Sequence, residues 1–306
     1  MHQINFSKIY IILGLSYVLI LAGCGMGDKN NREGKKETRP ALLNYVEYLD
    51  DMLQENSGLI HFRGTLWTIN DSGGDPVLFA LDKETGKTLQ AIYVKNGSNK
   101  DWESLAQDKQ NIYICDVGNN YGRRDELEIY IISKDSIPSS GNATVTAEII
   151  HYTYADRIEN NGPFRRSPFD CEAAFAFGDS LYLFTKDWET LSTTLYTCPT
   201  SPGTYSLKPR QTFPVDGLIT GADISPDCSH IILCGYKDHV PLIWIFSNFN
   251  PMEHSTDTIH RFDYPGYIDL QTEGIAIVSP EEVLISCELT EYPAALYILN
   301  LLSYLK

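Results

Sequence analysis

The clearest candidates for catalytic or metal-binding residues are glutamates that occupy the same position in several similar segments of the chain. Glu103, Glu172 and Glu273 each precede a small residue and a short apolar run, in the segments ESLAQD, EAAFAF and EGIAIV. In a fourth segment, SGLIHF, Ser57 fills the same place, and Glu55 lies two positions earlier on the same face of an extended strand. Converging carboxylates raise one another's pKa unless a cation compensates their charge, and Ca²⁺ suits flexible oxygen coordination. We therefore expect a calcium site built from Glu55, Glu103, Glu172 and Glu273; the alternative is a water-filled channel whose carboxylates pair with Lys or Arg.

The same carboxylates could serve binding or catalysis. A bound ion would polarise a lactone carbonyl or a phosphoryl oxygen, and Glu103 or Glu172 would activate a water molecule. A fifth segment, TGADIS, departs from the pattern, because Thr220 fills the glutamate position and Asp223 follows three residues later. Glu103 and Glu172 are thus the catalytic candidates, and the reaction stays open.

Polar and aromatic residues near strand ends form a second group of candidates. NDSGG follows one apolar strand, and DVGNN, with two arginines beyond it, follows the next. Amide, guanidinium and indole groups around a metal would suit a polar or anionic small ligand, although Asn, Asp and Gly are also what tight turns require. The candidates for ligand binding are Asn70, Asp71, Trp102, Asp116, Asn119 and Arg123.

A fivefold repeat supplies the elements that would position these side chains. Each repeat contains two apolar runs of β type, and the second run begins 12 to 17 residues after the first. A segment of the glutamate type precedes each pair of runs, and an outer run follows four of the five pairs. Repeats of this kind predict the four-stranded blades of a β-propeller, in which the first strand of each blade lines the central channel. The first runs begin at Leu66, Ile112, Leu181, Ile231 and Val283, at spacings of 46 to 69 residues.

The repeat predicts an all-β fold, a five-bladed β-propeller. Residues 42–49, LLNYVEYL, have outer-strand character and lie just before the first repeat, so this N-terminal strand would complete the fifth blade and close the ring. The main alternative is a six-bladed propeller with residues 155–169 as a degenerate blade. That segment, ADRIENNGPFRRSPF, is short and charged, which favours an inserted loop.

Residues 1–24 have the features of a lipoprotein signal peptide. Lys8 precedes the apolar run IYIILGLSYVLILAG, which ends in the pattern L-A-G-C at Cys24. We expect cleavage before Cys24 and lipid attachment to its sulfur, the alternatives being an ordinary signal peptide or an N-terminal membrane anchor. Residues 25–40 are polar and predict a disordered tether, so the propeller domain is expected over residues 41–306. The expected location is the membrane surface, as a lipoprotein facing the periplasm or the cell exterior.

The predicted domain is strongly acidic. Of the 24 Lys and Arg, one lies in the signal and five in the tether, and of the 40 Asp and Glu three lie in the tether. The domain therefore carries 18 basic and 37 acidic side chains, a formal charge of −19. Such a surface repels nucleic acid, so we expect no nucleic-acid partner. Six cysteines remain beyond Cys24, none in a CxxC pair, and buried free thiols are the expectation.

Several segments resemble a known class of exported proteins. They are SGLIHFRGTLWTINDSGG, DWESLA, YICDVGNN with Arg123, DCEAAFAFGDSLYLFTKDW, TGADISPD and TEGIAI, within residues 55–290. This set resembles exported β-propeller lipoproteins of the Bacteroidetes type and, more distantly, the SdiA-regulated, gluconolactonase/regucalcin and esterase-like phytase propellers. The resemblance implies a calcium ion near the channel and, in enzymatic relatives, lactone or phosphoester hydrolysis. The residues that match the acidic columns are Glu55, Glu103, Glu172 and Glu273, with Asp116 and Asn119 as lesser matches.

Three functions follow as hypotheses. The first is a lipid-anchored extracytoplasmic propeller that binds calcium in its channel and a small polar ligand or an envelope protein at the channel mouth. The second is a metal-dependent hydrolase of a lactone or phosphoester. The third is a sensor or assembly factor of the cell envelope.

Overall fold

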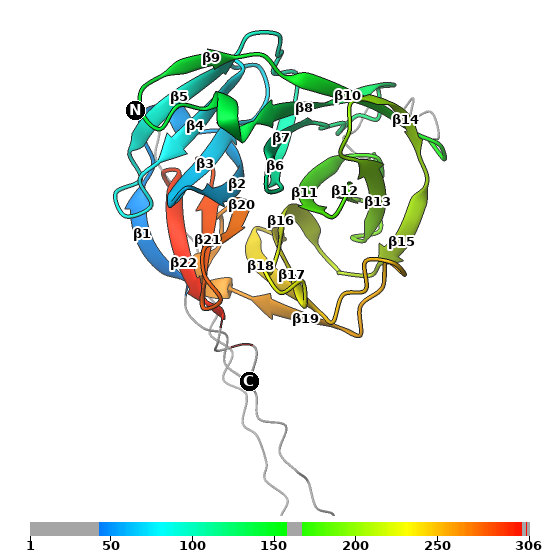
Figure 1. Ribbon diagram of the computed structural model, residues 1–306. Helices are drawn as coiled ribbons and strands as arrows, with labels where there is room; N and C mark the ends of the chain where they lie inside the picture. The colour runs from blue at the N-terminus through cyan, green and yellow to red at the C-terminus, as the bar shows by residue number, and fades with distance from the viewer. Residues whose placement is uncertain (1–42, 158–166, 302–303, 305–306) are drawn as a thin grey trace, which may run out of the picture. The chain divides into compact units, whose positions relative to one another are not determined.

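Five β-sheets arranged in a ring form the folded part of the protein (Figure 1). The computed structural model describes residues 43–157, 167–301 and 304, all of which belong to one compact unit, Arg39–Lys306. Each sheet is one blade, and the innermost strands of neighbouring blades contact one another around the ring. The prediction of an all-β, five-bladed β-propeller is confirmed.

Within each blade, four antiparallel strands follow one another from the centre outwards. Blade 1 contains β2 (Asn56–Phe62), β3 (Thr65–Asn70), β4 (Val77–Leu81) and β5 (Thr88–Val94). Blade 2 contains β6 (Trp102–Gln107), β7 (Asn111–Asp116), β8 (Leu127–Ser133) and β10 (Glu148–Tyr154). Blade 3 contains β11 (Cys171–Phe177), β12 (Ser180–Thr185), β13 (Thr193–Pro199) and β15 (Pro209–Phe213). Blade 4 contains β16 (Leu218–Ile224), β17 (His230–Lys237), β18 (Val240–Ser247) and β19 (Thr258–Asp263). Blade 5 contains β20 (Thr272–Ile277), β21 (Glu282–Cys287), β22 (Ala295–Asn300) and β1 (Asn44–Tyr48).

The N-terminal strand closes the ring as the sequence predicts. β1 pairs antiparallel with β22, with Tyr45 opposite Tyr297. This pairing occupies the outer edge of β22, which would otherwise present unpaired backbone groups. The first and last strands of the described chain therefore complete the same blade.

Two short strands escaped prediction, and both join one blade to the next. β9 (Ala143–Val145) pairs in parallel with β5 of blade 1, and β14 (Gly203–Leu207) pairs in parallel with β10 of blade 2. Each belongs by sequence to the following blade and adds a fifth strand to the preceding one. The segments ATV and GTYSL contain few apolar residues, so neither has the apolar run that marks the inner strands.

A β-bulge near the start of each innermost strand explains how the glutamates reach the channel. The bulged residue has no partner in the register of the next strand, and a bulge redirects the side chain that it carries. The unpaired residues are Gly58, Glu103, Glu172, Thr220 and Glu273. Ser57, the residue predicted for this column, lines one cavity together with Glu103, Glu172 and Glu273. In β2 the bulge itself lies at Gly58, whose φ of +62° favours glycine.

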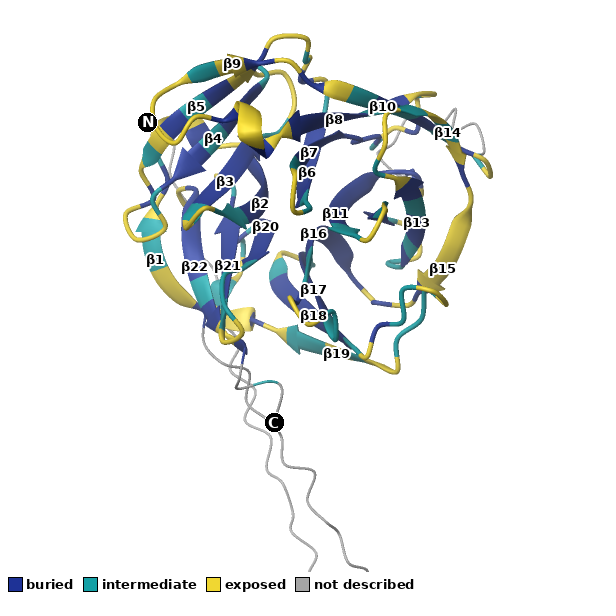
Figure 2. Ribbon diagram, in the orientation of Figure 1, coloured by how far each residue is buried: buried dark blue, intermediate teal, exposed yellow. Residues whose placement is uncertain are grey.

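Apolar side chains fill the spaces between adjacent blades. Figure 2 shows that buried residues concentrate on the inner strands and exposed residues on the outer strands and loops. The six cysteines within the described ranges carry free thiols, and five of them are buried, as expected. Such apolar packing is the main source of stability in a fold of this size.

Three predictions lie wholly or partly outside the described residues. They are the signal peptide with Cys24, the tether over residues 25–40, and the inserted loop over residues 155–169, of which residues 158–166 are not described. Among the described residues, no helix has both the length and the apolar character needed to cross a membrane.

Candidate functional site

Side chains from all five blades meet in one cavity of about 340 Å³, here called the acidic cavity. Six of its lining residues are carboxylic acids, and three of these are the bulged glutamates of the innermost strands. The remaining acids come from loops that follow or precede strands. The lining residues are Glu55, Ser57, Asp71, Ser72, Glu103, Asn120, Glu172, Lys186, Trp188, Tyr236, Gln271, Glu273 and Glu288.

A buried lysine lies against one of the glutamates. The Nζ atom of Lys186 lies 2.6 Å from Oε1 of Glu172, with 6% and 3% of the two side chains exposed. Lys186 directly follows β12, and its Nζ also lies 5.3 Å from the centre of the Trp188 ring. Neighbouring carboxylates outweigh the cost of burial and hold the pKa of Lys186 above its ordinary value. The expected alternative of carboxylate pairing with Lys thus applies to Glu172.

Three other carboxylates come close enough to share one metal ion. Oxygen atoms of Asp71, Asp101 and Glu103 all lie within 4.8 Å of one another. A Cβ atom placed on Gly118 would lie 2.4 Å from Asp101 Oδ2 and 2.4 Å from Glu103 Oε1, so only glycine leaves room for both groups. Hard oxygen donors of this kind are the ligands that Ca²⁺ and Mg²⁺ prefer, and the residues present therefore fit a divalent cation. We call this group the carboxylate trio.

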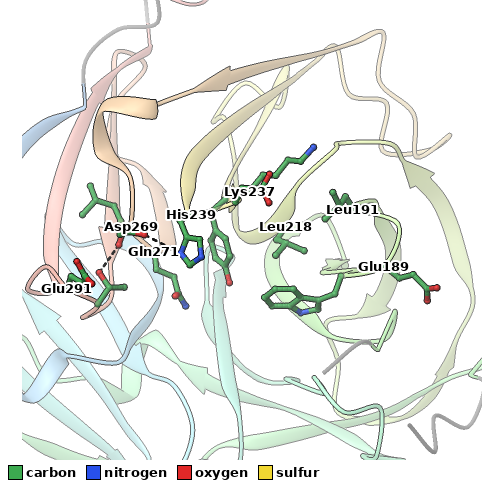
Figure 3. Close-up of a pocket in the computed structure, with 13 residues that line it drawn as sticks. Glu189, Leu191, Leu218, Lys237, His239, Asp269, Gln271 and Glu291 are labelled. Atoms are coloured by element: carbon green, nitrogen blue, oxygen red, sulfur yellow. Dashed lines mark hydrogen bonds and ion pairs between the residues drawn. The ribbon is translucent and has the colours of Figure 1, made fainter. Parts of the chain in front are cut away.

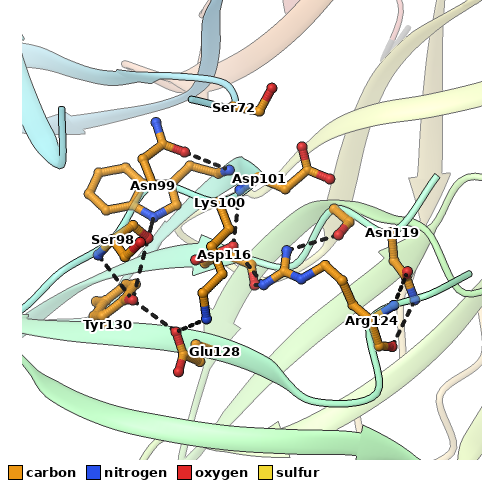
Figure 4. Close-up of polar contacts among 12 residues, drawn as sticks. Ser72, Ser98, Asn99, Lys100, Asp101, Asp116, Asn119, Arg124, Glu128 and Tyr130 are labelled. Carbon is orange, nitrogen blue, oxygen red and sulfur yellow. Dashed lines mark hydrogen bonds and ion pairs between the residues drawn. The ribbon is translucent and has the colours of Figure 1, made fainter. Parts of the chain in front are cut away.

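The main chain beside the trio is fixed by a buried ion pair (Figure 4). Arg124 Nη2 lies 2.7 Å from Asp116 Oδ1, and this same oxygen accepts a hydrogen bond of 3.1 Å from the backbone amide of Asp101. The amides of Val117 and Gly118 donate to the carbonyl of Asp101. These contacts hold the Asp101 backbone against the end of β7.

Asn99 connects the two loops that carry the trio. Its Nδ2 donates to the carbonyls of Asn70 and Asp71, at 3.0 and 2.6 Å, and its Oδ1 accepts from the Trp102 amide at 3.2 Å. The loop after β3 is thereby tied to the loop before β6. Asn99 is buried, so it is a positioning residue.

Burial raises the pKa of the acids in the cavity, and neighbouring negative charges raise it further. Desolvation, followed by the charges of Glu172 and Asp101, raises the pKa of Asp71 to about 7. Desolvation also raises the pKa of Glu172 to about 8, against the opposing effect of Lys186, and that of Glu288 to about 8. The pKa values of Glu103 and Glu273 lie well above the usual range for the same reason. A cation that enters the cavity must therefore displace protons at neutral pH.

The structure separates the predicted site residues into two groups. All four predicted metal ligands, Glu55, Glu103, Glu172 and Glu273, line the acidic cavity, and so does Asp71. Only Glu103 and Asp71 of these belong to the trio.

The other predicted ligand-binding residues lie outside the cavity lining. Trp102 is fully buried in the apolar core between blades 1 and 2, where its Nε1 donates to the Ser98 carbonyl at 3.1 Å. Asn70 donates through Nδ2 to the Met52 carbonyl at 2.7 Å. Arg123 is exposed, and its guanidinium lies over the ring of Tyr121.

Asp116 and Asn119 take part in the contacts of Arg124. Asp116 forms the buried ion pair described above, and Asn119 Oδ1 accepts from the Arg124 amide at 2.9 Å. The backbone amide of Asn119 donates to Asp170 Oδ1 at 2.7 Å. Arg124, and not Arg123, is therefore the arginine that supports the site.

Sequence reasoning missed Asp101, Lys186 and Glu288 as site residues. Asp101 lies two residues before Glu103, and this spacing indicates that both side chains lie on the same side of an extended chain. The bulge at Glu103 brings both carboxylates against Gly118. Lys186 and Glu288 each directly follow the second strand of a blade. Their shared position, directly after the second strand of a blade, is the sequence pattern that could have identified them.

A second cluster of possible metal ligands lies away from the channel. Glu126, Glu128 and His151 belong to the outer part of blade 2, and His151 Nδ1 lies 3.1 Å from Glu126 Oε1 and 3.7 Å from Glu128 Oε1. None of the three lines the acidic cavity.

Comparisons with known proteins find only distant likenesses to solved structures. No family model and no curated protein matches the sequence. Among solved structures, the PQQ-bound aldose sugar dehydrogenase of Streptomyces coelicolor has 12% sequence identity and a TM-score of 0.48, over 84% of this chain and 96% of that one. A hypothetical protein from Leishmania major has 10% identity and a TM-score of 0.49, over 85% of this chain and 90% of that one. The five-bladed assignment rests on the sheets themselves.

Proposed function

We propose that the protein is a propeller module of the cell envelope whose acidic cavity binds a divalent cation, calcium foremost, and presents it to a small polar ligand or an envelope partner. The observation that carries this proposal is the carboxylate trio of Asp71, Asp101 and Glu103. Its oxygens approach one another within 4.8 Å around Gly118, on backbone that buried hydrogen bonds hold in place.

The charge balance of the cavity supports a cation. Six carboxylic acids line the cavity, and Lys186 is the single basic residue among its described lining. Lys186 pairs with Glu172, so one positive charge faces six carboxylic acids in the described lining. A divalent ion would replace the protons that the raised pKa values of Asp71 and Glu103 imply.

Calorimetry on the purified full-length chain in detergent tests the proposal. We expect the chelator-treated protein to bind about one Ca²⁺ per chain and Asp101→Asn and Glu103→Gln to abolish that binding. Glu84→Gln, which changes an exposed glutamate in the turn after β4, is the matched control and should bind like the original protein. Unchanged binding in both trio variants would contradict the site.

A hydrolase is the second candidate, and the pair of Glu172 and Lys186 favours it. Both groups line the same cavity as Asp71 and Glu103, so a proton donor and acceptor stand beside the proposed ion. The ion would supply Lewis acidity for a lactone carbonyl or a phosphoryl oxygen. Glu172, whose pKa is about 8, would accept or return a proton at its carboxyl group.

The test of this candidate is a screen of a sugar lactone and an aryl phosphate ester with calcium present. Hydrolysis that Glu172→Gln removes while calcium binding persists would support catalysis. Turnover no faster than that of the buffer would leave the protein a binding module.

Attachment through a lipid on Cys24 is part of the proposal. The L-A-G-C pattern supports it. Intact-mass measurement of the protein from membranes should give the mass of a chain that begins at a diacylated Cys24, and Cys24→Ser should release the protein from the membrane. A Cys24→Ser variant that stays membrane-bound would contradict lipid anchoring.

A further inference from the structure

A larger cavity of about 770 Å³ opens beside the acidic cavity, and we call it the side cavity. Loops of blades 3, 4 and 5 form it (Figure 3). Its volume lies in the range that small organic ligands occupy. The lining residues are Trp188, Glu189, Leu191, Leu218, Tyr236, Lys237, Asp238, His239, Asp269, Leu270, Gln271, Thr290 and Glu291.

The two cavities share one wall. Trp188, Tyr236 and Gln271 line both of them. The rings of Trp188 and Tyr236 meet edge to face with their centres 6.5 Å apart, and Gln271 Nε2 donates to Glu273 Oε1 at 2.9 Å. A molecule in the side cavity would therefore contact the aromatic border of the acidic cavity.

The remaining wall offers apolar surface. Leu191, Leu218 and Leu270 line the side cavity and could contact a hydrocarbon body.

The charge of the side cavity is negative. Four carboxylic acids line it, namely Glu189, Asp238, Asp269 and Glu291. Its two basic residues are already engaged: Lys237 Nζ lies 2.5 Å from Asp216 Oδ1, and His239 Nδ1 lies 3.3 Å from Asp269 Oδ1. Figure 3 shows Lys237 extending away from Gln271. An anion would meet net repulsion here, whereas a cation would be attracted by both cavities.

We propose that the side cavity binds an organic cation, namely a protonated amine on an aromatic or alkyl body. The ammonium group would lie against the rings of Trp188 and Tyr236, which attract cations through their faces, and near the surrounding carboxylates. The body would contact the three leucines. This inference deepens the proposed function by naming the class of ligand, but it does not require the metal.

Binding of three matched probes tests the proposal on the full-length protein in detergent. The probes are phenylethylamine, 2-phenylethanol and 3-phenylpropionate, which are cationic, neutral and anionic at pH 7 and similar in size. Three of the four tryptophans, Trp67, Trp102 and Trp244, are buried in the core, so quenching of fluorescence by a probe should come from Trp188. We expect the amine to bind at least 10-fold more tightly than the alcohol, and the carboxylate not to bind. Equal binding of amine and alcohol, preference for the anion, or no binding of any probe would overturn the proposal.

Variants separate this site from the metal site. Trp188→Leu should weaken binding of the amine, measured by calorimetry, by about 2- to 30-fold, the range expected for loss of one aromatic contact to a cation. Tyr93→Leu changes an exposed ring on β5 and should bind the amine normally. Glu103→Gln should lose calcium but keep the amine, whereas Trp188→Leu should keep calcium. Loss of amine binding in Tyr93→Leu, or retention in Trp188→Leu, would show that the amine binds elsewhere.

Discussion

Gly118→Ala is the sharpest perturbation of the carboxylate trio. The added methyl group would lie 2.4 Å from an oxygen of Asp101 and 2.4 Å from an oxygen of Glu103, whereas ordinary contacts begin at 3.4 Å. Each oxygen must then move by up to 1.0 Å, the difference between these two distances. Calcium–oxygen distances span only about 2.3–2.6 Å, so at least one carboxylate would leave the coordination geometry.

The expected result is a 10- to 100-fold loss of calcium affinity, which is about the effect of changing residues that support metal ligands. The atoms that must move are ends of side chains, so the free energy of unfolding without metal should change by less than about 1 kcal/mol. Calcium titration by calorimetry measures the first quantity and urea denaturation in chelator the second. Gly266→Ala is the control, because no atom lies within 4 Å of its added methyl group. Unchanged calcium affinity in Gly118→Ala would refute the trio as the site.

Three further predictions follow from the same cavity. Because the pKa of Asp71 in the folded protein is about 7 and that of Glu288 about 8, both above their ordinary values, the metal-free folded state binds protons more tightly than the unfolded state. Its Tm in chelator should therefore fall as the pH rises from 5 to 8, and calcium should raise the Tm more at pH 8 than at pH 5; a Tm that rises with pH in chelator would contradict this assignment. Lys186→Met leaves Glu172 buried without its ion pair and should lower the free energy of unfolding by about 3–5 kcal/mol in urea, with most of it restored by adding Glu172→Gln; failure of the second change to restore stability would argue against the pair. Asn99→Ala removes the donors to the carbonyls of Asn70 and Asp71 and should weaken calcium binding by about 10-fold or more in calorimetry; full affinity would mean that these loops are held by other contacts.

Much of the fold could be predicted from the sequence because the sequence contains a repeat. Alternation within each apolar run gives the strands, and five recurrences give the blades. The short strands β9 and β14 were not readable, since their pairing with the preceding blade depends on tertiary contacts and not on a local pattern. The bulges of the innermost strands, such as the one at Gly58, were not predicted either, since they leave no pattern in the residue types.

The sequence could predict where the candidate site lies, but not how its side chains are arranged. The glutamates of the column line one cavity, but the column could not give the distances that group Glu103 with Asp71 and Asp101 and pair Glu172 with Lys186. Trp102 stands beside Glu103 in the chain, yet alternation along the strand directs its ring into the core. Side-chain direction and charge pairing therefore had to come from the structure.

The central claim is that Asp71, Asp101 and Glu103 hold a divalent cation. X-ray diffraction from crystals grown with calcium, recorded at a wavelength where calcium scatters anomalously, tests it most directly. The account predicts an anomalous peak within coordination distance of oxygen atoms from all three residues. An empty trio, with a peak only at Glu126, Glu128 and His151 or none at all, would contradict it.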